Sequence, residues 1–394
     1  MNDRTRRART WIRWSLRDLR HRAILVVAIA LLLALGTGLY TGLGSMESWR
    51  VASNDASFAQ LGVHDLRVEL SDGSFVERGR LTGVADGTVG VVAAEERLIV
   101  PTQVDASSGD DTILVPGQLV GVDVRGGGPL VDGLAAAEGR TLAPTDVGTA
   151  VVMLDQSFAD GRGLPSAGDA LVGGVPVRYV GHAQSPEYFV VTEGDAGLQG
   201  PGGFAIVFAP LEDAQRLAGR GAVVNDLVLR VATGVSPAEA ARELRSRLDE
   251  ELPGVGATIT TTEEIPAHRI LYRDAENDQL LMNIFAVLVL LGAALAAFNL
   301  ISRVVESQRR EFGISMALGT PVGRIALRPA LLGAQIAVLG TALGIVAGLG
   351  VSAALRNIPE DQLYLPTVET PFEPEVFARG AAVSIAVVVV ATAY

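Results

Sequence analysis

The segment QLLMNIFAVLVLLGAALAAFNLISRVVESQRREFGISMALG, residues 279–319, decides how the chain is organised. Its first part, Leu280–Ile301, has 22 uncharged residues, of which only Asn283 and Asn299 carry polar side chains. As an α-helix rising about 1.5 Å per residue it is about 33 Å long, and a hydrocarbon core is about 30 Å thick. The segment therefore predicts a helix that crosses a membrane and is followed, on the far side, by a short charged element.

The residues before this segment extend the predicted helix. Residues 266–278 are charged but compatible with a helix, and no Gly or Pro lies between Asn277 and Phe285. We therefore expect Pro266–Arg303 to form one rod, with its membrane part (membrane helix 2) at 279–302.

Three further apolar stretches predict the remaining membrane helices. Ala23–Leu43 has 21 uncharged residues and predicts membrane helix 1 at 23–45, and Ala330–Leu355 has 26 and predicts membrane helix 3 at 330–355. The last stretch, 380–394, has 15 residues, or about 22 Å of helix, which is shorter than a bilayer. We expect it to be a truncated membrane helix 4.

Charge alternates between the segments that flank these helices. The net charge is +6 in residues 1–22, -18 in 46–278, +3 in 302–329 and -3 in 355–380. Short basic segments mark the cytoplasmic side of a membrane protein. We therefore expect the N-terminus and the segment 303–329 to be cytoplasmic, and the domain 46–278 and the loop 356–379 to lie outside the cell membrane.

The first 22 residues predict an amphipathic helix at the membrane surface. Ile12, Leu16 and Leu19 share one side of a helical wheel, with Arg13, Arg17 and Arg20 beside them. Such a helix binds anionic lipid head groups. A basic tail that only sets orientation is the alternative.

The acidic segment 46–278 is long enough for one domain with two lobes. Residues 46–61 and 266–278 predict two stalk helices. Between them, runs bounded by Gly and Pro predict strands at 65–70, 90–94, 118–125, 150–154, 170–181, 204–209 and 227–231, and helices at 154–162, 211–220 and 236–250. The fold class that follows is a multi-pass α-helical membrane protein with a large extracytoplasmic α+β domain inserted between the first and second membrane helices.

Glycines in two membrane helices are spaced for close helix packing. Gly38 and Gly42 lie four residues apart in the first, and Gly340, Gly344 and Gly348 recur every four residues in the third. Small residues at this spacing allow helices to approach closely in lipid.

Composition excludes several kinds of chemistry. The chain has no Cys and no Lys, so it has neither a P-loop for ATP nor a thiolate nucleophile. The four His, at 21, 64, 182 and 268, show no metal-binding i, i+4 spacing. The acidic pairs Glu95-Glu96, Asp110-Asp111 and Glu263-Glu264 predict solvated surface, and the acidic domain should repel nucleic acid. We expect no catalytic residue, no metal site and no cofactor.

The run Gln308-Arg309-Arg310-Glu311-Phe312-Gly313-Ile314 followed by Ala317-Leu318-Gly319 resembles the coupling segment of FtsX-like and MacB-like ABC permeases. The family pattern has Ile where this chain has Phe312, which is also apolar. The order of one span, a large external domain and three spans agrees with the family. Glu138-Gly139-Arg140 to Pro186-Glu187-Tyr188 is similar, more loosely, to its extracytoplasmic core domain.

This resemblance implies a function and a set of partners. The chain would be the permease subunit of an ABC transporter in the cell membrane, paired with a separate cytoplasmic ATPase that docks on the coupling residues. Its other partners would be membrane lipids and a second permease, as another copy or a second half of the same chain. Export of a lipid, lipoprotein, peptide or drug is the expected activity. Mechanical regulation of an external cell-wall hydrolase is the alternative, and a sensor is disfavoured because no signalling domain follows membrane helix 2.

Overall fold

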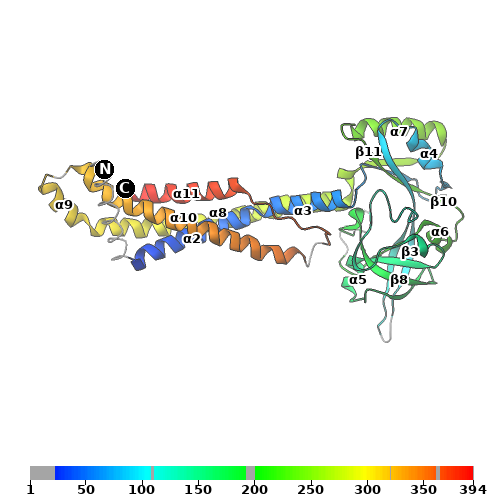
Figure 1. The fold of residues 1–394 in the computed structure, drawn as a ribbon, viewed down its shortest axis with the longest axis horizontal. Helices are drawn as coiled ribbons and strands as arrows, with labels where there is room; N and C mark the ends of the chain where they lie inside the picture. The colour runs from blue at the N-terminus through cyan, green and yellow to red at the C-terminus, as the bar shows by residue number, and fades with distance from the viewer. Residues whose placement is uncertain (1–22, 108–110, 192–199, 320, 361–363, 394) are drawn as a thin grey trace, which may run out of the picture. The chain divides into compact units, whose positions relative to one another are not determined.

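The computed structural model describes residues 23–107, 111–191, 200–319, 321–360 and 364–393 (Figure 1). These form two compact units. The helical unit contains residues 1–51, 275–359 and 370–394, and the sheet domain contains residues 52–274 and 360–369. The amphipathic helix expected at 1–22 lies outside the described residues.

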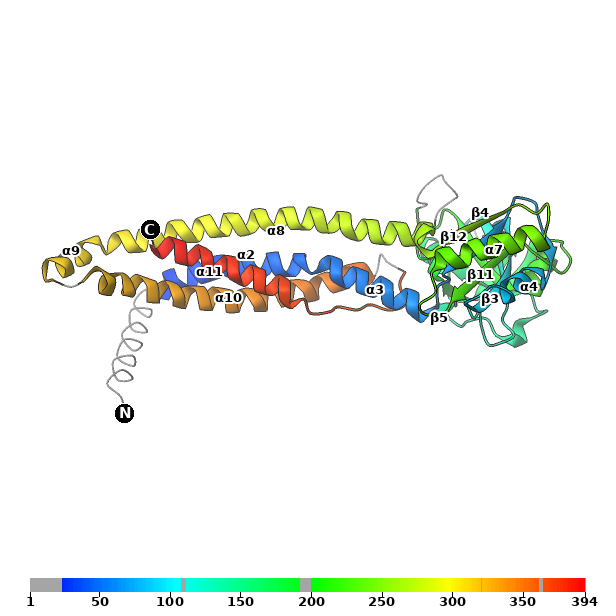
Figure 2. The same cartoon turned by 90° about the horizontal axis from the view of Figure 1, so that it is seen from above.

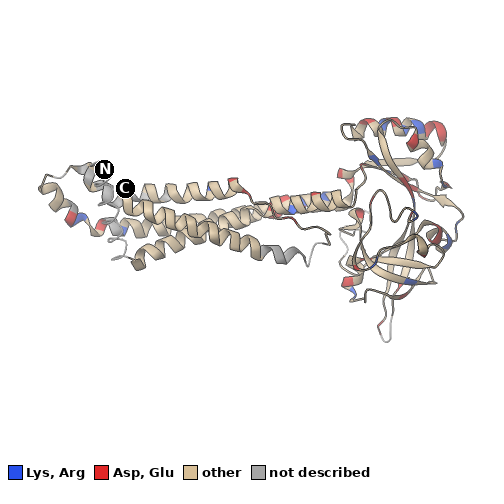
Figure 3. Cartoon of the chain, in the orientation of Figure 1, with Lys and Arg blue, Asp and Glu red and all other residues tan. Residues whose placement is uncertain are grey.

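The helical unit consists of long helices. Its elements are α2 (Ala23–Gly44), the first part of α3 (Met46–Gln60), most of α8 (Pro266–Ser307), α9 (Arg309–Ala317), α10 (Val322–Glu360) and α11 (Pro374–Ala393). Three stretches are long and apolar enough to cross a membrane, namely Ala23–Gln60, Pro266–Arg303 and Ala330–Ala354. Figure 3 shows that the apolar parts of these helices carry no charged residues. The stretch expected as membrane helix 4 falls in α11, which is not among the three; Tyr394 lies outside the described part.

The sheet domain contains the strands of the described chain. They are β1 (Leu66–Leu70), β2 (Val76–Glu77), β3 (Val91–Asp105), β4 (Leu114–Val122), β5 (Ala135–Gly139), β6 (Val151–Asp155), β7 (Gly168–Val172), β8 (Val175–Gln184), β9 (Ala205–Pro210), β10 (Val223–Val224), β11 (Asp226–Val231) and β12 (Ala257–Thr261). Ten of them form one mixed sheet in the order β12-β1-β11-β3-β4-β9-β6-β8-β5, with β7 paired to β3 and β8. The pairs β4–β9 and β6–β8 are parallel and the other pairs are antiparallel.

Both faces of the central strands are buried, because successive side chains point to opposite faces. Leu98 and Leu119 belong to one apolar cluster, and their neighbours Ile99 and Val120 belong to another. All six residues of β9 are buried, which explains its unbroken apolar sequence.

Short helices cover the sheet. These are α4 (Arg80–Asp86), α5 (Gln156–Gly161), α6 (Leu211–Leu217) and α7 (Pro237–Glu251). Helices α4 and α7 lie side by side in both views (Figure 1 and Figure 2). Helix α7 buries Ala240, Leu244 and Leu248, four residues apart on one face, and has its proline at the first turn.

The structure corrects several of the expected elements. Strand β3 runs on to Asp105, well beyond the expected 90–94, because its charged residues 95–97 are buried and have hydrogen-bond partners there. The expected strand 170–181 is a hairpin of β7 and β8, turned by Gly173 and Gly174, which both have positive φ. Helix α4 and strands β2, β5, β10 and β12 were not predicted, since these segments have weak apolar patterns. The fold class is confirmed as a membrane protein whose α+β domain is inserted between its first two apolar helices.

Candidate functional site

Helix α9 contains most of the coupling residues predicted from the sequence. Gln308 lies at the break between α8 and α9 and is buried. The helix ends at Ala317, and Gly319 then takes a φ of +79°, a backbone conformation that glycine adopts readily. The amides of Leu318 and Gly319 donate to the carbonyls of Ile314 and Met316 and so close the last turn.

The surface of α9 is exposed and of mixed character. Arg309, Arg310 and Glu311 are exposed, and Arg309 lies 3.9 Å from Glu306. Gly313 and Ala317 are exposed as well, and Ile314, Met316 and Leu318 expose 54%, 51% and 80% of their surface. The side chain of Phe312 lies outside the described part. A short exposed helix of this composition can dock against a protein partner through apolar contact and charge pairs.

Side-chain contacts join α3 to α8 in each unit. In the helical unit, Arg50 forms an ion pair with Asp278, and the amide of Glu47 donates to Gln279 Oε1 over 2.9 Å. In the sheet domain, the rings of Phe58 and His268 lie 5.4 Å apart. Helix α8 therefore contacts α3 in its first turn, at His268, and again at residues 278–279.

A segment between α10 and α11 also binds α3 in the sheet domain. Ser53 Oγ donates to the carbonyl of Glu369, and Ser57 Oγ donates to the carbonyl of Thr367 over 3.0 Å. Leu365 packs against the cluster that contains Phe58 and Leu271. In the sheet domain this segment therefore packs together with α3 and α8.

The predicted packing glycines of α2 and α10 face one another. A Cβ atom added at Gly38 would lie 2.7 Å from Ala347 Cβ, and one at Gly42 would lie 2.6 Å from Val351 Cγ1. Opposite them, Gly340 lies against Leu33, Gly344 against Thr37 and Gly348 against Thr41, each too close for an added Cβ. We call this contact the glycine seam.

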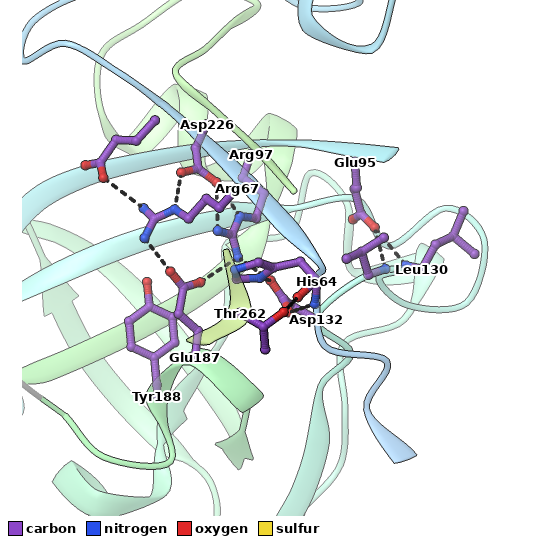
Figure 4. Close-up of polar contacts among 12 residues, drawn as sticks. His64, Arg67, Glu95, Arg97, Leu130, Asp132, Glu187, Tyr188, Asp226 and Thr262 are labelled. Atoms are coloured by element: carbon purple, nitrogen blue, oxygen red, sulfur yellow. Dashed lines mark hydrogen bonds and ion pairs between the residues drawn. The ribbon is translucent and has the colours of Figure 1, made fainter. Parts of the chain in front are cut away.

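A buried network of charges lies inside the sheet domain (Figure 4). Arg97 is 3% exposed, and its guanidinium contacts Asp226 at 2.7 Å, Glu187 at 2.8 Å and Asp132 at 3.2 Å. Arg67 also pairs with Asp226, at 2.6 Å, and with Glu187. His64 Nδ1 lies 2.7 Å from Asp132 Oδ2.

The network joins distant parts of the domain. Its members come from β1 and the residues just before it, from β3 and β11, from the loop before β5 and from the 3-10 turn Pro186–Tyr188. Burial opposes ionisation of Glu187, but Arg67 and Arg97 hold its pKa below the ordinary value. Glu187 is two residues from Phe189 in sequence. The ring centroids of Phe189 and of Phe58 in α3 lie 5.4 Å apart.

Glu95 and Glu96 correct the expectation of a solvated pair, since both are 6% exposed. The Glu96 carboxylate accepts from the amides of Gly79, Leu81 and Thr82, and so caps α4. The Glu95 carboxylate accepts from Asp123, Leu130 and Val131, and burial raises its pKa to about 7. Glu263 and Glu264 are exposed, as expected; Asp110 lies outside the described residues.

Sequence reasoning missed the buried network and both carboxylate caps. The one available signal was the run Glu95-Glu96-Arg97 between apolar stretches of a single strand. In the described ranges, no three His, Asp or Glu side chains form a ready metal-binding group.

The C-terminal part of the chain matches the model of a known family. The model of the FtsX-like permease C-terminal family matches residues 283–394, which include the later part of α8 together with α9, α10 and α11. This match confirms the resemblance drawn from the coupling run.

Similar proteins include the macrolide export ATP-binding/permease proteins MacB. MacB 1/2 of Paracoccus denitrificans is 26% identical over 241 residues, which are 59% of this chain and 34% of that protein. MacB of Hahella chejuensis is 27% identical over 239 residues, covering 59% and 35%. The chain thus spans about a third of the length of these relatives.

Solved structures that match part of the chain include the periplasmic region of MacB from Actinobacillus actinomycetemcomitans. It has a TM-score of 0.38 and 14% identity, and the match covers 53% of this chain and 93% of that one. The extracellular domain of the ABC-type transporter YknZ from Gram-positive bacteria has a TM-score of 0.34 and 14% identity, covering 50% and 100%.

Proposed function

From the match of residues 283–394 to the FtsX-like permease C-terminal family, we propose that this chain is the permease subunit of an ABC transporter. It sits in the cytoplasmic membrane with its N-terminus inside and its sheet domain outside. A separate cytoplasmic ATPase docks on α9 and drives movements of the sheet domain. The substrate class is a lipid, lipoprotein, peptide or drug that is exported or extruded.

The coupling run and its exposed helix carry this proposal. Helix α9 follows directly on α8 and presents both charged and apolar side chains at its surface. Its Gly313 has open space around it, since an added Cβ would meet no atom within 4 Å. This exposure supports a docking role, because a connector between two membrane helices has no need of an exposed apolar surface.

Helix α8 supports the mechanical part of the proposal. It is one helix of 42 residues that starts in the sheet domain and ends at the break before α9. A continuous helix transmits displacement along its axis, whereas a flexible linker absorbs it. The ion pair and hydrogen bond to α3 brace it against bending.

Export is favoured over hydrolase regulation by the relatives, whose names describe macrolide export by fused ATP-binding and permease proteins. A polar substrate path through the membrane is disfavoured, because the apolar stretches contain no charged residue. The substrate therefore meets the sheet domain or the outer leaflet.

The decisive experiment separates docking from folding. A Cβ atom added at Gly313 meets no atom within 4 Å, so we expect the effect of Gly313→Leu to report on a partner. We expect it, and Glu311→Arg, to abolish stimulation of the copurifying ATPase while the protein still inserts. The matched control is Gly350→Leu in α10, where an added Cβ also meets open space. Wild-type stimulation in both α9 variants would refute the coupling assignment, and coupling without export would favour the regulator.

A further inference from the structure

Residues 364–373 form neither helix nor strand, and two buried serines of α3 bind their backbone. The Ser53 hydroxyl donates to the carbonyl of Glu369 at 3.1 Å and accepts from the amide of Glu369 at 2.9 Å. The Ser57 hydroxyl makes the same two bonds with Thr367, at 3.0 and 3.3 Å. A hydroxyl both donates and accepts, so each serine satisfies both backbone groups of one residue.

The spacing of the two serines matches the spacing of alternate residues in an extended chain. Four residues of a helix rise about 6 Å, and two residues of a strand rise about 6.6 Å. Ser53 and Ser57 thus supply the hydrogen bonds that a paired strand would give to Glu369 and Thr367. One turn further along α3, Gln60 Oε1 accepts a hydrogen bond from Thr367 Oγ1.

Apolar contact joins the same segment to the rest of the sheet domain. Leu365 is half-buried and packs against a cluster that contains Phe58 of α3, Leu271 of α8 and Phe189. Phe189 directly follows the 3-10 turn that carries Glu187 of the buried charge network. The segment is therefore attached to α3, to α8 and to the strand-bearing part of the domain.

The other end of the segment is attached to α11. The ring centroids of Phe372 and of Phe377 in α11 lie 4.8 Å apart. Between Leu365 and Phe372 the chain has Pro366 and Pro371 and no Gly. Proline fixes its own φ and holds the preceding residue extended, so a short chain with two prolines acts as a semi-rigid spacer. A displacement of α11 should therefore reach α3 without being absorbed by slack.

We propose that residues 364–373, which we call the link, transmit movement of α11 to α3 and so to the sheet domain. The link is a second connection in addition to α8, and Ser53 and Ser57 are the positioning residues that couple it to α3. This role rests on the proposed function, in which a cytoplasmic ATPase drives movement of the sheet domain.

Hydrogen exchange of the permease in complex with its copurifying ATPase tests the two serines. Without nucleotide, Ser53→Ala/Ser57→Ala should speed exchange of the Thr367 and Glu369 amides about tenfold, because both lose their acceptor. With nucleotide trapped by vanadate, the exchange change in the sheet domain should shrink about twofold, because only α8 still transmits. The matched control is Ser48→Ala in α3, whose hydroxyl donates within its own helix at 3.0 Å; it should alter neither result.

A covalent rescue distinguishes loss of the link from misfolding of the variant. Gln60→Cys and Thr367→Cys are added to the double serine variant and joined by a short bis-methanethiosulfonate crosslinker. These two side chains contact one another, and the chain has no Cys of its own. Crosslinking should restore the nucleotide response of the sheet domain, and reduction of the same sample should remove it again.

Three results would overturn the role of the link while the wild-type sheet domain responds to nucleotide. These are unchanged exchange at residues 367 and 369, a full response despite faster exchange there, and no recovery after crosslinking. A wild-type sheet domain that does not respond to nucleotide would instead contradict the proposed function itself.

Discussion

At the scale of single residues, the buried charges of the sheet domain carry the largest desolvation cost. Two guanidinium groups are surrounded by Asp132, Glu187 and Asp226, all of them buried. Taking such groups out of water costs free energy, and only mutual pairing offsets it. Removal of one partner leaves the others unpaired in the interior.

Arg97→Met should therefore lower the free energy of unfolding of the sheet domain by about 3–5 kcal/mol. Pulse proteolysis in urea measures this change. The control is Arg178→Met, since Arg178 is 69% exposed and lies 3.7 Å from its Asp169 partner; we expect a change below about 0.5 kcal/mol there. Equal effects of the two substitutions would mean that the network contributes little.

Glu95 should make stability depend on pH. Burial raises its folded pKa to about 7 from the ordinary 4.5, so between these values the folded chain holds more protons than the unfolded one. The unfolding free energy should then fall as pH rises from 4.5 to 7, by up to about 3 kcal/mol, and level off above.

Urea unfolding across this pH range tests the assignment. Glu95→Gln should make the unfolding free energy depend less steeply on pH. Part of the dependence should remain, because burial also raises the pKa of Asp155 to about 7 and Asp155 still titrates. Glu239→Gln, at an exposed position, should leave the slope as it is. A slope in Glu95→Gln equal to that of the wild type would contradict the pKa shift.

At the scale of elements, the helices and strands with a long apolar pattern could be predicted from the sequence. Helix α8 extends from Pro266 to Ser307, four residues past the expected rod. Strand β3 could not be predicted in full, because Glu95, Glu96 and Arg97 are polar residues whose partners come from distant segments. The same holds for His182, whose neighbours Glu138 and Asp160 are far from it in sequence. Pairing of this kind is a property of the folded chain.

The glycine seam offers a test at this scale. Gly344→Leu places a side chain where Thr37 Cβ already lies, since even an added Cβ would be 2.7 Å from it. We expect α2 and α10 to separate, with a fall in unfolding temperature of several degrees in detergent. Gly350→Leu, in the same helix but facing open space, is the control and should melt like the wild type. Identical melting of both variants would mean that the seam is not a packing interface.

At the scale of the whole molecule, a transmitting α8 should be sensitive to a break in its backbone. Proline at position 278 removes a backbone hydrogen bond and kinks a helix. Asp278→Pro should leave ATPase binding intact and abolish the response of the sheet domain to nucleotide. Site-directed spin labels are a suitable readout, because the chain has no Cys of its own.

The control for this variant is Asp278→Ala, which removes the ion pair with Arg50 and preserves the helix. We expect it to keep most of the response. An unimpaired response in Asp278→Pro would show that α8 does not transmit the movement.

The glycine seam has a further consequence, because both of its sides repeat every four residues. Leu33, Thr37 and Thr41 of α2 lie against Gly340, Gly344 and Gly348 of α10, so the two helices run parallel in matching steps. An axial shift of α10 by four residues, about 6 Å, would bring Leu33 opposite Gly344 and Thr37 opposite Gly348. Helices elsewhere are known to ratchet by one turn. In the shifted register Leu33 and Thr37 would still face glycine, whereas Thr41 would face Ser352 in place of Gly348. The two registers are thus alike over the first two steps of the seam, and a movement of one helical turn exchanges them there.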